Sequence, residues 1–229
     1  VGAGTSGRLG VLDAAECPPT FLVPKGLVRG IIAGGSQALT DSVEGAEDSV
    51  ADGRAAVVAA EVEPNDVVFA IASGGTTPYV HGALQAAREG GAKTVFFACV
   101  PREQQLDDAD VSIRVVTGPE VITGSTRMKA GTATKMVLNM LTTGAMVLMG
   151  KTYGNLMVDL QATNTKLVER AQRIVCKLTE LSREEAIQLL DRCDGELKTA
   201  IVAHRLNIAP DQARTRLAVA EGHLRKALE

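Results

Sequence analysis

The chain has 229 residues, of which 45% are hydrophobic and 22% charged, and its formal net charge is −3. This length allows a substantial core, and the composition is that of an ordinary globular protein. Lys and Arg are scattered and only 3% of residues are aromatic, which argues against a basic, base-stacking surface and therefore against a nucleic-acid partner. The longest uncharged apolar stretch, residues 136–150, is too short to span a bilayer, so it predicts a buried helix and no membrane association.

The first part of the chain alternates predicted strands and helices. Residues 66–72 and 93–100 are near-continuous apolar runs, as in strands buried on both faces of a parallel sheet. The clearest helix begins at Thr77 as N-cap, has Pro78 in its first turn and ends at Gly90. This alternation predicts an α/β fold with helices on both faces of a parallel sheet. The other elements expected here are a helix over 7–15 ended by prolines 18 and 19, a strand over 27–32, a helix over 40–49 and a strand over 111–116.

The rest of the chain is predicted to be helical. A long helix is expected over 131–149, and one or two more over 155–177. A capping box, in which Ser182 and Glu185 each satisfy a free N–H of the other, predicts a helix start just after residue 180. Two short helices, near 196–205 and 210–228, complete a small three-helix module. We therefore expect two domains, 1–180 and 181–229, the second with a structural or partner-binding role.

The cysteines and histidines are too far apart to form a recognisable metal site. The four cysteines, at positions 17, 99, 176 and 193, contain no C-x-x-C pair and are expected to be thiols in a reducing compartment. The first residues do not have the pattern of a signal peptide, so none is expected. Neither a metal nor a redox cofactor is expected.

Three loops rich in Gly, Ser and Thr occupy residues 2–8, 73–78 and 123–132. Each offers backbone N–H groups and hydroxyls where a helix begins, which is how a protein binds a phosphate without a metal. Any one loop alone would more often be an ordinary cap or turn. Together they predict a phosphorylated small molecule as ligand. The candidate phosphate-binding residues are Thr5, Ser6, Ser73, Ser125 and Thr126, with Arg127 and Lys129 adding charge-assisted contacts.

The spacing Gly2-x-Gly4-x-x-Gly7 also matches the dinucleotide-binding fingerprint. That fingerprint requires an acidic residue about 20 positions further on, to bind the ribose hydroxyl. Residues 17–40 contain neither Asp nor Glu. A sugar phosphate is therefore favoured over NAD.

Two glutamates near the first loop are candidates for acid–base chemistry. Glu16 is predicted at the end of a short helix, where the partial negative charge favours its protonated form. Glu44, Glu47 and Asp48 are spaced i, i+3, i+4, so mutual repulsion on one helix face favours protonation of one of them. On spacing alone, a solvated acidic face is the better interpretation of the second group.

The motifs around these residues resemble the N-acetylmuramic acid 6-phosphate etherase family. The matching blocks follow the family order over nearly the whole chain. They are residues 2–10, the run from Asp13 to Thr20 with Glu16 in A-E-C-P-P, residues 44–49 (E-G-A-E-D-S), residues 123–132 and residues 153–159. The family has a sugar isomerase (SIS) fold and acts as a homodimer in the bacterial cytoplasm, in cell-wall recycling. Related animal glucokinase regulatory proteins share the fold but bind sugar phosphates and a partner enzyme.

The resemblance implies cleavage of the lactyl ether of N-acetylmuramate 6-phosphate into N-acetylglucosamine 6-phosphate and D-lactate. It assigns the catalytic acid to Glu16 and the base to Glu47, with the phosphate held by Thr5, Ser6, Ser125 and Thr126. Two departures stand out. The family has about sixty residues before Gly2, including a strand of the sheet, and its middle loop reads A-S-G-R/T-T-P where this chain has a shifted Ala72–Pro78. Ser73 serves there only if the loop re-registers.

Two other functions fit the same fold. One is a non-catalytic sugar-phosphate-binding regulator of the glucokinase-regulator type. The other is an aldose–ketose isomerase, which would also use a carboxylate to move the C2 proton. Retention of both glutamates in their motifs favours the etherase.

Overall fold

The computed structural model describes the chain in two compact units. The division falls within two long helices, α1 (Gly4–Phe21) and α4 (Lys129–Leu148). The described residues are 1–160 and 164–229; the first unit consists of Val1–Ala15 and Val28–Met140, and the second of Glu16–Leu27 and Leu141–Glu229.

The first unit is built on a parallel sheet of three strands in the order β1–β2–β3. These are β1 (Val67–Ile71), β2 (Lys93–Ala98) and β3 (Val111–Arg114), with Phe69 opposite Val95 and Val95 opposite Val111. Beyond β1, Gly2 forms parallel bridges to both Ile71 and Ile32. The first residues of the chain thus continue the sheet at the edge where β1 lies.

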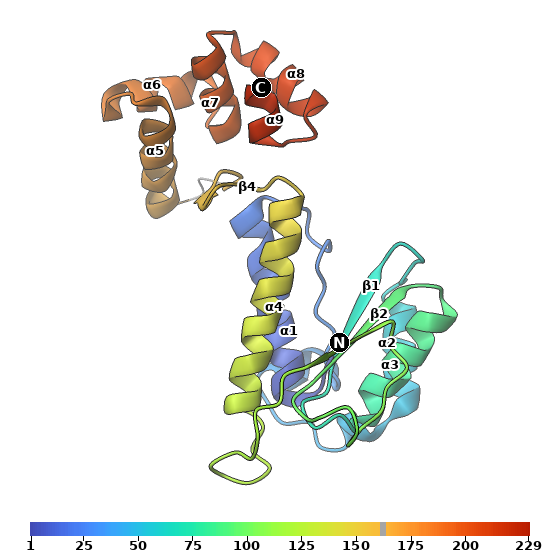
Figure 1. Cartoon of the computed structure of the whole chain (residues 1–229). Helices are drawn as coiled ribbons and strands as arrows, with labels where there is room; N and C mark the ends of the chain where they lie inside the picture. The colour runs from blue at the N-terminus through green and yellow to red at the C-terminus, as the bar shows by residue number, and fades with distance from the viewer. Residues whose placement is uncertain (161–163) are drawn as a thin grey trace. The chain divides into compact units, whose positions relative to one another are not determined.

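Helices cover both faces of this sheet, as the apolar strand sequences predicted. On one face, Val80 and Leu84 of α3 (Pro78–Glu89) pack with Ala70 and Phe96, and α2 (Val50–Ala59) packs against α3. On the other face, Ile71 and Phe97 pack with Ala130 and Leu138 of α4. Figure 1 shows α2 and α3 on one side of the strands and α1 with α4 on the other. The predicted α/β class is confirmed.

Two predicted elements of this unit are wrong. The strand expected over 27–32 is reduced to the bridge at Ile32, because Gly30 passes so close to α1 that a Cβ there would lie 2.5 Å from Val11 Cα. The helix expected over 40–49 is replaced by bends and a short 3₁₀ turn, η2 (Ala46–Asp48). Gly45 adopts a left-handed conformation (φ 74°), and the Ser49 hydroxyl accepts a bond from the Asp52 N–H, so the helix begins only at Val50.

Helix α1 also differs from its prediction. It was expected to stop before Pro18, but it continues through Pro18 and Pro19 to Phe21. A proline inside a helix costs about 3 kcal/mol, because it lacks an N–H and crowds the carbonyl four residues earlier. Ala14 and Cys17, in the turn before the prolines, are 8% and 3% exposed.

The second unit begins its C-terminal part with a small hairpin. Strands β4 (Thr152–Tyr153) and β5 (Leu156–Met157) are antiparallel and turn at Gly154, which has a φ of 58°. Helix α5 (Thr165–Thr179) follows. The helices predicted over 155–177 are therefore confirmed only from residue 165; residues 161–163 of that range lie outside the described residues.

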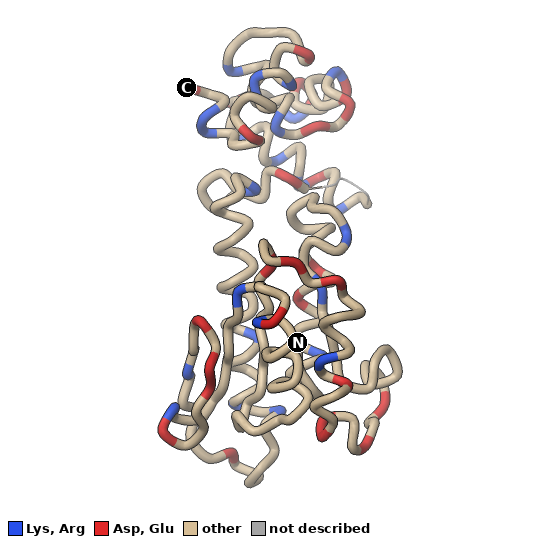
Figure 2. Tube along the Cα trace, turned by 90° about the vertical axis from the view of Figure 1, so that its right-hand side faces the viewer, with Lys and Arg blue, Asp and Glu red and all other residues tan. Residues whose placement is uncertain are grey.

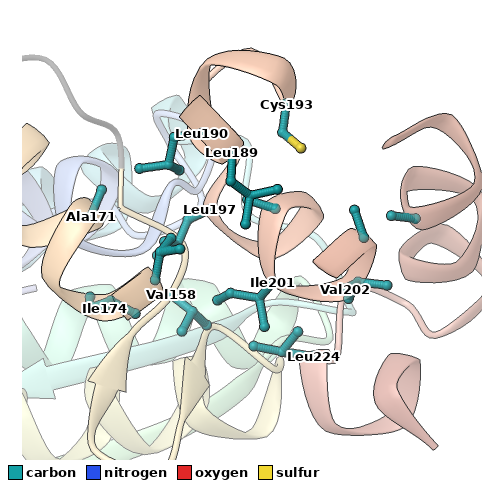
Figure 3. Close-up of a cluster of buried hydrophobic side chains, with 14 of the residues drawn as sticks. Val158, Ala171, Ile174, Leu189, Leu190, Cys193, Leu197, Ile201, Val202 and Leu224 are labelled. Atoms are coloured by element: carbon teal, nitrogen blue, oxygen red, sulfur yellow. The ribbon is translucent and has the colours of Figure 1, made fainter. Parts of the chain in front are cut away.

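Four further helices follow residue 180 in the described part of the chain. They are α6 (Arg183–Arg192), α7 (Leu197–Leu206), α8 (Pro210–Val219) and α9 (Leu224–Leu228). The capping box predicted at Ser182 and Glu185 is present. The single helix expected over 210–228 is instead interrupted, because Glu221 and Gly222 both have positive φ. Figure 3 shows the apolar side chains of these helices and α5 gathered around Ile201.

The helices after residue 180 repeat one sequence pattern. Residues 182–202 match residues 209–229 when the two segments are aligned from their first residues. At the start of each segment the side chain three residues on accepts from the N-cap N–H, Glu185 from Ser182 and Gln212 from Ala209, and each segment contains a turn in which an acidic residue and a Gly have positive φ. The matching apolar positions are buried in both copies: Ala186 with Ala213, Leu190 with Leu217, Leu197 with Leu224 and Ala200 with Ala227. The module is thus two copies of one helix–turn–helix motif.

A buried lysine joins the repeats to the hairpin region. Lys198 is 8% exposed, and its Nζ donates to Gly150 O (2.9 Å), Gly222 O (2.6 Å) and Asp159 Oδ2 (2.5 Å). Burial lowers the pKa of Lys198, while Asp159 raises it. Three acceptors thus converge on one ammonium.

We predict that Lys198→Met destabilises the folded state by roughly 3 kcal/mol, because it leaves two carbonyls without their donor and removes one of the two lysines that pair with the Asp159 carboxylate, the other being Lys151 at 3.3 Å. Lys226→Met is the matched control: its side chain is 58% exposed and lies 3.8 Å from Glu221, so a change below about 1 kcal/mol is expected. Thermal unfolding of both variants checks this. Equal midpoints would show that the Lys198 cluster contributes nothing to stability.

Candidate active site

The first glycine-rich loop leads directly from the sheet into α1. The N–H of Gly2 donates to Ile31 O (3.0 Å), its carbonyl accepts from Ala33 N (3.0 Å), and α1 begins two residues later. Thr5 and Ser6 therefore lie in the first turn of a long helix. Ser6 is 9% exposed, and Thr5 is half-buried.

The second loop meets the first. Residues 72–77 follow β1 and lead into α3, and Ser73 O accepts from the N–H of Cys99 at the end of β2 (2.8 Å). The hydroxyl oxygens of Ser73 and Ser6 are 3.3 Å apart. Two of the predicted phosphate-binding side chains, 67 residues apart in sequence, are thus in hydrogen-bonding contact.

The third loop also lies beside the first. A Cβ placed on Gly131, at the start of α4, would lie 3.5 Å from Cγ2 of Thr5. Ser125 is half-buried, whereas Thr126 and Arg127 are exposed. The Lys129 ammonium donates to Thr117 O (2.8 Å) and so is held at the edge of this loop.

A glutamate that the sequence analysis missed occupies the start of α4. The Glu120 carboxylate accepts from the N–H groups of Lys129 (3.0 Å) and Ala130 (2.9 Å). These bonds, that from Ala130 first, lower the pKa of Glu120. Two amides at the N-terminus of α4 thus already have an anionic partner. Glu120 precedes the helix by nine residues, outside any capping spacing.

Glu47 lies at the edge of a pocket beside the first loop. It sits in η2, is exposed, and lines a cavity of about 130 Å³ together with Gly4, Arg8 and Glu44. Ser42 Oγ donates to Glu44 Oε1 (2.5 Å). The expected helical spacing of the acidic residues is wrong, because this segment is not an α-helix.

Glu16 is exposed on α1 and belongs to the second unit, whereas Glu47 belongs to the first. The helix does not end at Glu16 but five residues later, at Phe21. The predicted effect of a helix C-terminus on Glu16 is therefore wrong, since that effect is confined to the last turn.

Other features bear on ligand chemistry. Acidic and basic residues are interspersed along the chain in both units (Figure 2). Across residues 1–160 and 164–229, no three His, Cys, Asp or Glu side chains are grouped to hold a metal ion. In the same ranges, no helix has the length and apolar character needed to cross a membrane.

Family comparisons agree with this arrangement. The glucokinase regulatory protein N-terminal SIS domain matches residues 1–88, the SIS domain matches residues 49–144, and the C-terminal lid domain of glucokinase regulatory protein matches residues 154–193. The N-acetylmuramic acid 6-phosphate etherase of Synechocystis sp. is 56% identical over all 229 residues, which cover 75% of that relative. The etherases of Nostoc punctiforme and Picosynechococcus sp. are 57% and 56% identical over the whole chain, which covers 74% and 76% of them.

The chain belongs to the N-acetylmuramic acid 6-phosphate etherase family. In its first unit, the three loops that carry the predicted phosphate-binding residues lie close to one another. The glutamate of the E-G-A-E-D motif lines a pocket beside them. The pairing of Ser6 with Ser73 is the part of the site that the structure defines most sharply.

The Glu120 cap yields a prediction on stability and pH. A carboxyl whose pKa is lower in the folded state stabilises the fold above its unfolded pKa, about 4.3, and loses that contribution as the pH falls through its folded pKa. We therefore expect Glu120→Gln to lower the melting temperature at pH 7, with the difference from wild type shrinking as the pH falls below about 4.

Glu103→Gln, in an exposed loop of the same unit, is the control and should leave the melting temperature unchanged both at pH 7 and below about pH 4. Thermal scans across this pH range measure the effect. A wild-type advantage that stays constant, or grows, in acid would contradict the assigned cap.

Proposed function

We propose that the chain is an N-acetylmuramic acid 6-phosphate etherase that cleaves the D-lactyl ether of its substrate, giving N-acetylglucosamine 6-phosphate and D-lactate. The observation that carries this proposal is identity of 55% or more to named etherases over the entire chain. The function is that of a carbon–oxygen lyase acting on a sugar phosphate.

The reaction suits two carboxyl groups. In the open-chain sugar, the C1 aldehyde makes the C2 proton acidic. Glu47 removes that proton as general base, while Glu16 protonates the ether oxygen at C3 as general acid, and lactate departs. Water then adds to C3 of the unsaturated aldehyde. Proton transfers account for every step, so the reaction requires no redox cofactor.

The three loops would hold the phosphate. Ser6 and Ser73 lie within hydrogen-bonding distance of each other at the carboxyl ends of parallel strands, where ligands bind in open α/β sheets. Thr5, Ser125 and Thr126 would add hydroxyl donors, and Arg127 and Lys129 positive charge. The Lys129 ammonium would then act on the phosphate from the place where it donates to Thr117 O.

A non-catalytic sugar-phosphate-binding regulator is the second candidate. It is supported by the matches of residues 1–88 and 154–193 to domains of glucokinase regulatory protein. Such a protein would be stabilised by the ligand without turning it over. An isomerase, the third candidate, would turn over a sugar phosphate but release no lactate.

A homodimer in the cytoplasm is part of this proposal. Met136 and Met140 lie one turn apart on α4 and are 47% and 64% exposed. Apolar side chains stacked on one helix face are suited to a subunit interface.

Replacing either catalytic glutamate by glutamine is predicted to lower D-lactate release at least about 100-fold, because glutamine neither accepts nor supplies the proton. The Kd of the Glu16→Gln and Glu47→Gln variants for N-acetylglucosamine 6-phosphate should differ from that of wild type by less than about threefold. An enzymatic lactate assay and calorimetry measure the two effects.

The matched control is Glu61→Gln, which alters an exposed turn and should retain full turnover. Near-normal turnover in Glu16→Gln or Glu47→Gln would remove that residue from the mechanism. Tight binding with no turnover by the wild-type chain would favour the regulator.

Removing either of the paired hydroxyls should weaken phosphate binding. We expect Ser6→Ala and Ser73→Ala each to raise the Kd for N-acetylglucosamine 6-phosphate about tenfold, the loss of one hydrogen bond to a charged group. Because the hydroxyls are in contact, the double variant should lose less than the sum. Thr215→Ala, on α8, should bind as wild type; affinities of all four variants equal to that of wild type would place the phosphate elsewhere.

A further inference from the structure

Arg8 links the first loop to the segment that carries Glu47. It lies in the first turns of α1, four residues after Gly4, and both residues line the pocket that Glu47 also lines. Its Nε donates to Leu39 O (3.2 Å) and its Nη2 donates to Asp41 O (2.9 Å). The guanidinium thus holds two backbone carbonyls at the end of the 3₁₀ turn η1 (Gly35–Leu39).

The segment that Arg8 holds has little hydrogen bonding of its own to other elements. The other hydrogen bonds described for residues 40–45 stay within residues 37–48. They include Asp41 N to Gln37 O (3.1 Å), Asp48 N to Gly45 O (3.1 Å) and the bond from Ser42 Oγ to Glu44. Arg8 therefore provides the hydrogen bonds that fasten this irregular segment to a long helix.

The same helix turn carries the hydroxyls of the first loop. Thr5 and Arg8 are three residues apart, so they lie on neighbouring positions of one helix face. Ser6, between them, contacts Ser73. Helix α1 thus carries side chains of the proposed phosphate site. Through Arg8 it also holds the backbone segment that leads into η2 and Glu47.

We propose that Arg8 is a positioning residue for Glu47: by binding the carbonyls of residues 39 and 41, it sets the distance between the base and the bound phosphate. This inference rests on the proposed function, in which Glu47 removes the C2 proton. The planar guanidinium is suited to the task because its two N–H directions are fixed relative to each other, whereas a lysine ammonium offers no such fork.

The test is Arg8→Lys, with Arg8→Ala as a second variant, assayed for D-lactate release from N-acetylmuramate 6-phosphate. A misplaced base lowers kcat and leaves ground-state binding intact. The expected result is a fall in kcat of about 10- to 100-fold with KM changed less than about threefold. Arg54→Lys, the same exchange in a surface ion pair with Glu89, is the control and should keep wild-type kinetics.

A kinetic isotope effect separates positioning of the base from a general structural defect. With substrate deuterated at C2, the isotope effect on kcat in Arg8→Lys should equal or exceed that of wild type, because proton removal becomes the slower step. A normal kcat, a loss confined to KM, or an isotope effect that falls toward one would each overturn the inference. If Arg8→Ala does not fold, Arg8→Lys alone decides.

The proposed function and this inference fail differently. A wild-type chain that releases no lactate, or a Glu47→Gln variant that releases it normally, overturns the proposed function and the inference with it. An active wild type with an inactive Glu47→Gln variant and a fully active Arg8→Lys variant overturns the role of Arg8 alone.

Discussion

The close approach of the first loop to the sheet is the constraint on which the site depends. A Cβ on Gly2 would lie 2.8 Å from Gly7 N, and one on Gly7 would lie 2.5 Å from Ile32 Cγ1. Only glycine fits at both positions, so the chain can leave the sheet at Gly2 and enter α1 at once. This tight entry brings Ser6 to Ser73 and Thr5 to the start of α4.

The site combines rigid and irregular parts. The hydroxyls of Thr5 and Ser6 lie in the first turn of α1 and that of Ser73 follows β1, where the sheet and its packed faces hold the backbone. Glu47 instead sits in a 3₁₀ turn after a bent segment. A base on such a segment needs an additional restraint, and the two carbonyl bonds of Arg8 supply one. In this account, phosphate affinity and proton removal depend on different elements and can be altered separately.

The sequence predicted the parts of the fold that local rules govern. Continuous apolar strands, the Pro78 start of α3 and the capping box of α6 all follow from nearby residues. The predicted elements that are wrong depend on distant contacts or on backbone geometry. Gly30 is held against Val11, α1 continues through two prolines, and a left-handed Gly45 prevents a helix over the acidic residues. The repeat after residue 180 was readable in the sequence, since equivalent residues stand at a constant offset.

For the candidate site, the residue types indicated which side chains could bind a phosphate, but not which of them contact one another. The contact of Ser6 with Ser73 spans 67 residues and requires the parallel order of the strands. Glu120 and Arg8 gave no local signal, because their partners are backbone groups that lie outside any capping spacing, nine and ten residues away for Glu120 and 31 and 33 residues away for Arg8. The motif assigned a role to Ser73 only on condition that its loop re-registers, and the 3.3 Å contact is consistent with that role.

A crystal structure of the chain with N-acetylglucosamine 6-phosphate would show which groups bind the phosphate. We expect phosphate oxygens within about 3.2 Å of the hydroxyls of both Ser6 and Ser73. A phosphate bound away from these hydroxyls, for example among the cationic side chains of Arg170, Arg173 and Lys177 on α5, would contradict this expectation.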